Sequence, residues 1–257
     1  SAGDSRWHEA GHGTAFRTRW MNDAVYHLAC FFMIRSPTVW RWSHTRHHTD
    51  TIIVGQDPEI ITPRPPQVGR LALNLFGLID APLALAMMVR HARGQLTEDQ
   101  KLYVPESEFP KVAKEARVWL VIDVVVLAVT LAWWNPLPLL LVLGPRFYGT
   151  WLHIVFGVSQ HIGLAEDVTD HRRNARTIRM NPVFRFLYLN MNYHVEHHIF
   201  PNVPYHALPD LHEEIKDKLA PVYPSLVAAY REIIPTLVRQ RRDPTYFVER
   251  PLPEVTA

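Results

Sequence analysis

The longest apolar run lies in the middle of the chain, over residues 118–145. It contains no Lys or Arg and is interrupted at Asn135–Pro136, a pair that favours a turn. The pattern predicts two helices joined by a tight turn. The first, roughly 117–134, is long enough to cross a membrane, and the second must continue to about Val158 to reach about 20 residues. Because this extension contains Arg146, which is costly in a bilayer, we expect that side chain to face the bundle interior or the interface.

Two other apolar segments are less suited to crossing a membrane. Residues 71–89 are interrupted midway by Asp80 and Pro82, so we expect an interfacial or re-entrant segment. Residues 23–34 would rise only about 18 Å as a helix, against a hydrocarbon core of about 30 Å. We expect them to lie along the membrane surface. Two amphipathic helices are predicted by the positions Leu208, Leu211, Ile215 and Leu219, and then Leu226, Tyr230, Ile233 and Leu237.

Composition narrows the class of protein. The 257 residues are 47% hydrophobic and 20% charged, which favours a globular or peripherally membrane-embedded chain. We interpret it as one domain, 1–257, and the helical patterns above predict the all-α class. A net charge of +2 is too small to indicate a nucleic-acid partner. The single cysteine, Cys30, excludes an intrachain disulfide, a thiolate zinc site and an iron–sulfur cluster held by this chain alone. We expect Cys30 to be a small buried apolar residue.

Histidine is the residue type that points to chemistry, because most of the 15 histidines occur in clusters. The motif HEAGH has two histidines at i and i+4, and HTRHH and HVEHH each have three at i, i+3 and i+4. An HxxHH pattern is expected about 0.05 times in a shuffled chain of this composition, so finding two is a strong signal. On helices, such spacing brings imidazoles close enough to bind one metal or a close metal pair. The clustered histidines are His8, His12, His44, His47, His48, His194, His197 and His198.

The number of imidazoles limits the kind of metal site. Imidazole ligands suit zinc, copper or iron, so the ligand type alone does not select the metal. Eight or more histidines exceed the needs of one tetrahedral zinc and indicate two metals with open positions for oxygen. If all clusters share one site, the chain between His48 and His194 must cross the membrane an even number of times. Two crossings by the apolar segments described above satisfy this requirement.

Basic residues on both sides of the predicted hairpin indicate its orientation, because such residues stay on the cytoplasmic side of a membrane. Trp133 and Trp134 at the turn suit the opposite interface, so we expect an integral membrane protein with its site on the cytoplasmic face. The fold would then be a membrane hairpin, interfacial helices and a cytoplasmic helical cap that carries the clusters. A mean hydropathy of −0.09 leaves open a buried hairpin of a soluble protein. The flanking cations are Arg90, Arg93, Lys101, Lys111, Lys114 and Arg117 before the hairpin, and Arg172, Arg173, Arg176, Arg179 and Arg185 after it.

The three motifs, in this order, resemble the histidine boxes HxxxH, HxxHH and (H or Q)xxHH of membrane fatty acid desaturases and their hydroxylase relatives. The third lies within NYHVEHHIFPNVPYHALP, and the resemblance extends from His8 to about Pro209. The resemblance implies that a further histidine, near the end of the last membrane helix, completes the site. By position, this histidine is His161. The sequence differs from the family pattern at its N-terminus. Desaturases have a membrane hairpin before the first box, whereas only seven residues precede His8 here. We expect that this hairpin is absent or that the sequence is truncated.

The resemblance implies an oxygen-dependent oxidoreductase with two non-haem iron ions, which introduces a double bond into a fatty acyl chain of a lipid or thioester. No catalytic residue is expected beyond the metal ligands. A separate ferredoxin or small haem protein with its reductase must supply electrons, because no haem segment, glycine fingerprint or cysteine cluster is present. Hydrogen-bonding partners for the ligands are sought among neighbouring acids and amides: Glu9, Asp50, Asp57, Glu196, Asn190 and Asn192.

Three alternatives remain at this level. HEAGH also fits the HExxH motif of zinc metalloproteases, with Glu9 as general base, although that hypothesis uses only two histidines. Hydroxylases or ketolases of lipids and carotenoids carry similar boxes. A metal-storage membrane protein is the non-enzymatic alternative. Under the desaturase hypothesis, His197 and His198 matter much more than His206 and His212, which lie beyond two prolines and lack the spacing.

Overall fold

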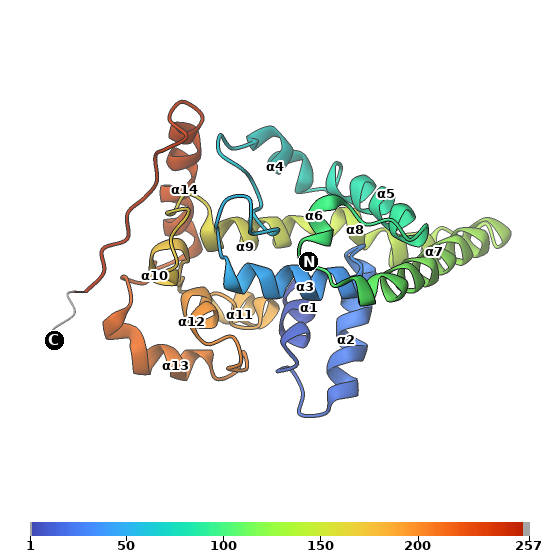
Figure 1. Cartoon of the computed structure of the whole chain (residues 1–257), viewed down its shortest axis with the longest axis horizontal. Coiled ribbons are helices and arrows are strands. Elements are labelled where there is room, and N and C mark those ends of the chain that lie inside the picture. The colour runs from blue at the N-terminus through green and yellow to red at the C-terminus, as the bar shows by residue number, and fades with distance from the viewer. Residues whose placement is uncertain (1, 254–257) are drawn as a thin grey trace.

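The computed structural model describes residues 2–253 of the chain (Figure 1), with side-chain burial from residue 5 onward. Every regular element in that range is helical. Extended pairing there is limited to two isolated bridges, Thr177 with Tyr193 and Ile178 with Tyr223. The all-α class predicted from the sequence is therefore confirmed.

The N-terminal part contains the helices α1 (Ala2–His12), α2 (Arg19–Phe32) and α3 (Pro37–Thr49). The first histidine box lies on α1 and the second on α3. α1 and α2 pack against each other through a buried cluster that includes Trp7, Tyr26 and Cys30. Cys30 is fully buried, as expected of a small apolar residue. The Tyr26 hydroxyl donates a hydrogen bond of 2.8 Å to the Pro37 carbonyl, which links this pair of helices to the start of α3.

Residues 71–89 do not form one helix. The segment is divided between α4 (Val68–Asn74) and α5 (Asp80–Ala92), with a bend at residues 75–79. The Asn74 side-chain oxygen accepts hydrogen bonds from the backbone amides of Ile79 and Asp80, so Asp80 begins the second helix. The short helices α6 (Glu98–Lys101) and η1 (Glu106–Glu108) follow. The interfacial placement of 71–89 stays a prediction.

A long helical hairpin follows, with the predicted turn near Asn135. Its first helix, α7 (Phe109–Ala132), begins eight residues before the expected position 117. The chain returns through η2 (Leu139–Leu143), α8 (Pro145–Tyr148) and α9 (Thr150–His161). Arg146 faces the interior, as expected: its guanidinium donates two hydrogen bonds to the Asp123 carboxylate, at 2.9 and 3.0 Å, and one to the Phe31 carbonyl. This buried ion pair joins the two arms.

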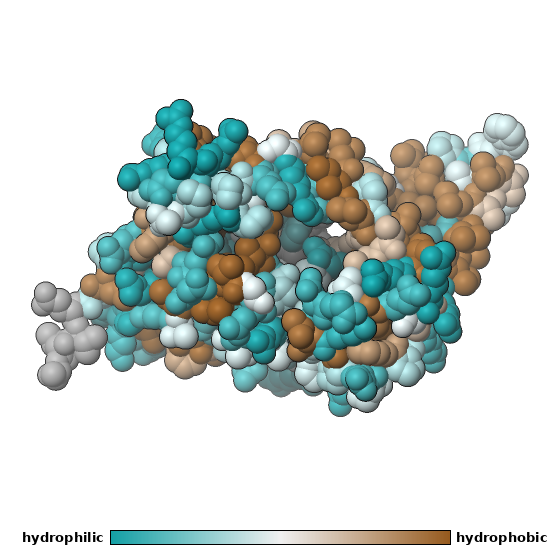
Figure 2. All heavy atoms as spheres, turned by 45° about the horizontal axis from the view of Figure 1, so that its top comes forward, coloured by the Kyte–Doolittle hydropathy of each residue, from teal (hydrophilic) through white to brown (hydrophobic). Residues whose placement is uncertain are grey.

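The far end of the hairpin projects beyond the rest of the molecule and is largely hydrophobic on its surface (Figures 1 and 2). Trp133 and Trp134 at its turn are 72% and 95% exposed. Within the described residues, one helical run, Leu139–His161, is long and apolar enough to cross a membrane by length and composition. The first arm, α7, which was expected to cross, does not meet this requirement, and membrane insertion and the number of crossings stay predictions.

The C-terminal third carries the third histidine box and the two predicted amphipathic helices. Its helices are α10 (His171–Asn174), α11 (Pro182–Tyr188), α12 (His194–Ile199), α13 (Leu208–Ile215), η3 (Lys216–Lys218) and α14 (Leu226–Gln240). α14 packs on α9 through Ile154, Val158, Ile233 and Leu237. This contact holds the end of α9, which carries His161, beside the third box.

Candidate metal centre

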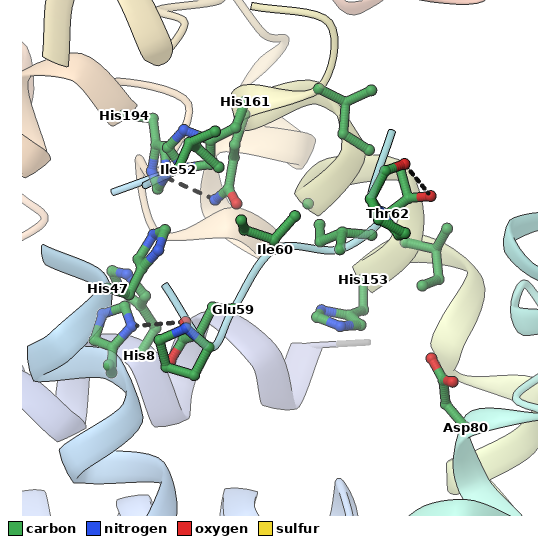
Figure 3. Close-up of a pocket in the computed structure, with 18 of the residues that line it drawn as sticks. His8, His47, Ile52, Glu59, Ile60, Thr62, Asp80, His153, His161 and His194 are labelled. Carbon is green, nitrogen blue, oxygen red and sulfur yellow. Dashed lines mark hydrogen bonds and ion pairs between the residues drawn. The ribbon is translucent and has the colours of Figure 1, made fainter. Parts of the chain in front are cut away.

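The structure brings all nine histidines that the sequence singled out into two adjoining clusters. Cluster A contains His8, His12, His44, His48 and His197, and cluster B contains His47, His161, His194 and His198. Within each cluster, one ring nitrogen from every member lies within 4.8 Å of the others. The clusters meet where the rings of His48 and His198 approach to 4.5 Å between centroids. The imidazoles come from α1, α3, α9 and α12, and Figure 3 shows His8, His47, His161 and His194 around one end of a pocket.

Helical geometry explains how each box is divided between clusters. At about 100° per residue, position i+4 lies about 40° from position i, whereas i+3 lies about 60° to the other side. In the second box, His44 and His48 belong to cluster A and the i+3 residue, His47, to cluster B. In the third box, His194 and His198 belong to cluster B and the i+3 residue, His197, to cluster A. The first box has no i+3 histidine and contributes both of its histidines to cluster A.

Four of the nine histidines have an acceptor beside Nδ1 that fixes the orientation of the ring, and a fifth, His194, has its Nδ1 3.4 Å from the Gln160 side-chain nitrogen. The Nδ1 atom of His47 lies 2.8 Å from the Asp57 carboxylate, and that of His44 lies 3.1 Å from the Glu59 carboxylate. The Nδ1 of His161 lies 2.8 Å from the Asn174 carbonyl oxygen. Because these acceptors require a proton on Nδ1, Nε2 carries a free lone pair directed into the cluster.

The fourth case, His198, follows from the hydroxyl of Thr51. That hydroxyl donates to the His47 carbonyl at 2.6 Å, so its oxygen accepts the hydrogen bond from His198 Nδ1 at 3.1 Å. Nε2 of His198 is therefore also a lone-pair donor. Thr51 thus orients one histidine side chain of cluster B and contacts the backbone of another, and the sequence did not single it out.

The crowding of Nε2 atoms fits a bound cation. In cluster A, Nε2 of His44 lies 3.0 Å from that of His12 and 3.1 Å from that of His48. In cluster B, Nε2 of His194 lies 2.8 Å from that of His161 and 3.0 Å from that of His198. His194 can donate a proton to only one of its two lone-pair neighbours. A cation at the centre of each cluster would satisfy all of them at once.

Burial keeps most of these imidazoles neutral, which is the form that binds a metal. Removal from water, together with the neighbouring histidines, holds the pKa values of His44, His48, His194, His197 and His198 well below the usual value of 6.5. The pKa of His12 falls to about 4 for the same reasons. Burial also opposes a charge on His47, but the hydrogen bond and charge of Asp57 outweigh it and raise the pKa of His47.

The acids and amides proposed as partners of the ligands have mixed outcomes. Asp57 has the predicted role. The other three acids contact groups outside the clusters: Glu9 accepts hydrogen bonds from Thr14 and the Tyr205 amide, Asp50 pairs with Arg46, and Glu196 contacts Thr177 and His212. The two amides do so as well: Asn190 accepts from Arg185 and donates to the Tyr205 carbonyl, and Asn192 donates to the Ile178 carbonyl. Glu59 was missed, although the acidic pair in QDPE at 56–59 was a usable signal.

The geometry argues against the metalloprotease alternative. That mechanism needs the Glu9 carboxylate to face the metal and activate water. Glu9 is 1% exposed, and its carboxylate oxygen accepts hydrogen bonds from the Thr14 hydroxyl at 2.6 Å and the Tyr205 amide at 3.1 Å. His8 and His12, moreover, share their cluster with three further histidines. The HExxH pattern here is a coincidence of spacing.

A cavity of about 250 Å³ reaches the clusters from one side. Its wall includes His8, His44, His47, His161 and His194, one or more from each box and from the end of α9. Figure 3 shows the histidines at one end of this pocket, Asp80 at the other and His153 between them. A substrate in this cavity would lie directly beside both clusters.

Together, the helical fold and the paired clusters define a helical protein with three histidine boxes gathered around one candidate metal centre. Comparison with known proteins gives the family: residues 2–230 match the family described as fatty acid desaturase. The chain belongs to this family. It is also 25% identical, over 235 residues, to an acyl-lipid omega-3 desaturase (cytochrome b5) of the endoplasmic reticulum from Arabidopsis thaliana. That match covers 84% of this chain but only 60% of the relative.

Proposed function

We propose that this protein is an oxygen-dependent di-iron oxidoreductase that introduces a double bond into a fatty acyl chain of a lipid or thioester. The observation that carries the proposal is the pair of adjoining all-histidine clusters, of five and four imidazoles, in a member of the fatty acid desaturase family. The proposed ligands are His8, His12, His44, His48 and His197 for one metal, and His47, His161, His194 and His198 for the other.

The spacing of the nitrogens is compatible with bound iron. For a metal–nitrogen bond of about 2.1 Å, ligands at right angles place their nitrogens about 3.0 Å apart, whereas tetrahedral ligands place them about 3.4 Å apart. The Nε2 contacts of 2.8–3.1 Å in both clusters match right angles. Iron held by these imidazoles would supply oxygen-dependent redox chemistry.

The residues of this chain bind the metals and the substrate, orient the ligands and exclude water. Bound iron would supply the activation of oxygen and the removal of hydrogen from an unactivated C–H bond. Asp57, Glu59, Thr51 and the Asn174 carbonyl keep the Nδ1 protons in place, so that four Nε2 lone pairs face the metals. The burial of the clusters excludes water, and the adjoining cavity holds the substrate against them.

Electrons would come from a separate ferredoxin or small haem protein with its reductase. The name of the plant relative includes cytochrome b5, which supports a haem-protein donor for this chain as well. The apolar hairpin surface supports an integral membrane location, with the clusters on the cytoplasmic face as the basic flanks predict. The chain as a whole, 1–257, would act as a single desaturase-like domain.

The same site would also support hydroxylation or ketone formation on a lipid or carotenoid, because the outcome depends on how the substrate lies against the metals. Product analysis separates these reactions from desaturation. The test of the main proposal is metal analysis of purified protein, combined with lipid profiling of cells that express it. We expect about two irons per chain, since nine imidazoles provide four or five ligands to each metal. One zinc per chain together with peptidase activity would refute the proposal.

A further inference from the structure

Two of the nine proposed ligands, His12 and His48, are partly exposed, whereas the other seven are buried. Both belong to cluster A, and neither lines the cavity of about 250 Å³ described above. His12 instead lines a separate pocket of about 230 Å³ at the turn between α1 and α2, called here the His12 pocket. Figure 1 shows this turn at an edge of the molecule, away from the projecting end of the hairpin. Cluster A is therefore accessible from the surface through a second opening.

The wall of the His12 pocket has an excess of positive charge. It includes three arginines, Arg17, Arg19 and Arg41, against one acid, Asp23, which leaves two positive charges in excess. The Asp23 carboxylate is shared between two of the arginines, 3.9 Å from Arg19 and 3.3 Å from Arg41. The side chain of Arg19 is 93% exposed, and Arg17 is exposed as well. Iron bound in cluster A would add positive charge behind His12, so this pocket attracts an anionic partner.

The positive excess is centred on the side of His12. An adjoining pocket shares Arg19 and Arg41 and adds Lys111 against Glu108 and Glu115. Lys111 pairs with Glu108 at 3.6 Å, and Glu115 accepts hydrogen bonds from the start of α3. Over both pockets four cations face three acids, so the excess falls to one positive charge with distance from His12. Lys111 also belongs to the flank that the sequence predicts to be cytoplasmic, which places the His12 pocket on that side.

Another basic surface near the centre, on α10, is balanced by acids. α10 contacts α12, which carries the third box, so it lies on the side of cluster B. Arg172 pairs with Asp170 at 2.7 Å, and Arg173 pairs with Glu249 at 3.3 Å. All four ligands of cluster B are buried. This surface therefore combines neither an excess of charge nor an exposed ligand, whereas the His12 pocket has both.

We propose that the His12 pocket is the docking site of an acidic electron-carrier protein, whose cofactor comes against the edge of the His12 ring. The inference rests on the proposed function, which requires an external donor, and it specifies where that donor binds. In each encounter one electron leaves the cofactor of the donor and reduces iron held by cluster A. Electron transfer weakens steeply with distance, so a partly exposed ligand offers a short route from the surface. Electron-transfer partners form small interfaces guided by charge, which suits a patch of three arginines.

The test measures binding of a donor and does not depend on turnover. The probes are the soluble haem domain of cytochrome b5 and a ferredoxin, both of net negative charge, added to the purified full chain with its bound metal in detergent at low salt. We expect Arg17→Ser to weaken binding by about fivefold and Arg17→Glu by about 25-fold, because each step removes about one charge pair. The differences should vanish near 1 M salt, where the Debye length is about 3 Å. Arg17→Lys should retain the affinity, and a carbodiimide should couple its amine to a carboxylate of the probe.

The matched control is Arg173→Ser, since Arg173 lies on the side of cluster B and is already paired with Glu249. This variant should bind the probes as the parent does, and weaker binding by it alone would overturn the docking site. Full affinity in Arg17→Glu would also overturn it and would leave anionic lipid head groups as the partner of these arginines. The absence of saturable binding by both probes would overturn it as well. Docking at the His12 pocket without acyl oxidation would refute only the proposed function, whereas acyl oxidation with the donor bound elsewhere would refute only this inference.

Discussion

His197 and His198 are neighbours in the sequence but face different clusters. Nε2 of His197 lies 3.1 Å from Nε2 of His48 in cluster A, and Nε2 of His198 lies 3.0 Å from Nε2 of His194 in cluster B. The 100° step of the helix separates the two rings. One short helix, α12, therefore contributes to both proposed metals and sets their relative position.

Replacement of His197 by Ala should abolish product formation and reduce bound iron, because cluster A loses one of its five imidazoles and the proposed metal is left displaced. The measurements are iron content and product yield at matched expression. The control is His206→Ala, since His206 is exposed and belongs to neither cluster. Full iron and full turnover in the His197 variant would show that the third box does not bind the metal.

Replacement of Asp57 by Asn should weaken metal binding or activity by about 10- to 100-fold, because the amide no longer holds the Nδ1 proton of His47 as strongly. Iron content after dialysis against a chelator measures the effect. Asp50→Asn is the matched control, since Asp50 lies close in sequence but pairs with Arg46 at the surface. Equal iron retention in both variants would contradict the orienting role of Asp57.

His212 has a buried partner that its sequence position did not indicate. It lies outside both clusters, as expected, but its Nδ1 contacts the carboxylate of Glu196, which is fully buried and also accepts a hydrogen bond from Thr177. We expect His212→Ala to lower stability by about 3–5 kcal/mol, because it leaves a buried carboxylate without its partner. Thermal midpoints should show this loss. Adding Glu196→Gln should recover much of it, and no recovery would contradict the ion-pair explanation.

Cysteine labelling should reveal the orientation of the hairpin. Cys30 is fully buried and should not react, so single cysteines can be introduced at Arg93, Asn135 and Arg173 without interference. We expect an impermeant reagent to reach positions 93 and 173 from the cytoplasmic side and position 135 only from the other side, because basic flanks stay in the cytoplasm. Opposite accessibility of positions 93 and 173 would contradict a single shared site.

The metal-free protein should lose stability as the pH falls. The pKa of His12 is about 4 in the folded chain, against 6.5 usually, and five other ligands are lowered as well. Below pH 6.5 the unfolded chain binds protons that the folded chain does not, so unfolding is favoured progressively down to about pH 4. Four groups whose pKa values are raised, His47, Glu59, Glu9 and Glu166, act in the opposite direction but are outnumbered by these six histidines. Thermal midpoints between pH 7.5 and 5 measure the effect, and a constant midpoint would contradict it.

The sequence by itself determined the helical class, the hairpin with its turn near Asn135 and the eight clustered histidines, whereas His161 followed only from the family resemblance. These features depend on local periodicity and on residue types that rarely cluster by chance, so a linear pattern contains them. The interior placement of Arg146 was one of the two positions expected from the sequence, because a charged side chain in an apolar helix needs a partner or access to the interface.

Only the tertiary structure decided how the histidines divide into two clusters and which groups orient them. Thr51 reaches His198 across 147 positions of sequence, and the loop residue Glu59 contacts His44, a pairing that the motif QDPE by itself does not specify. The ion pair of Arg70 and Asp80 likewise links α4 to α5 across the turn at residues 75–79. Spacing along one helix specifies the directions of its own side chains, whereas contacts between distant segments are set by how the whole chain packs.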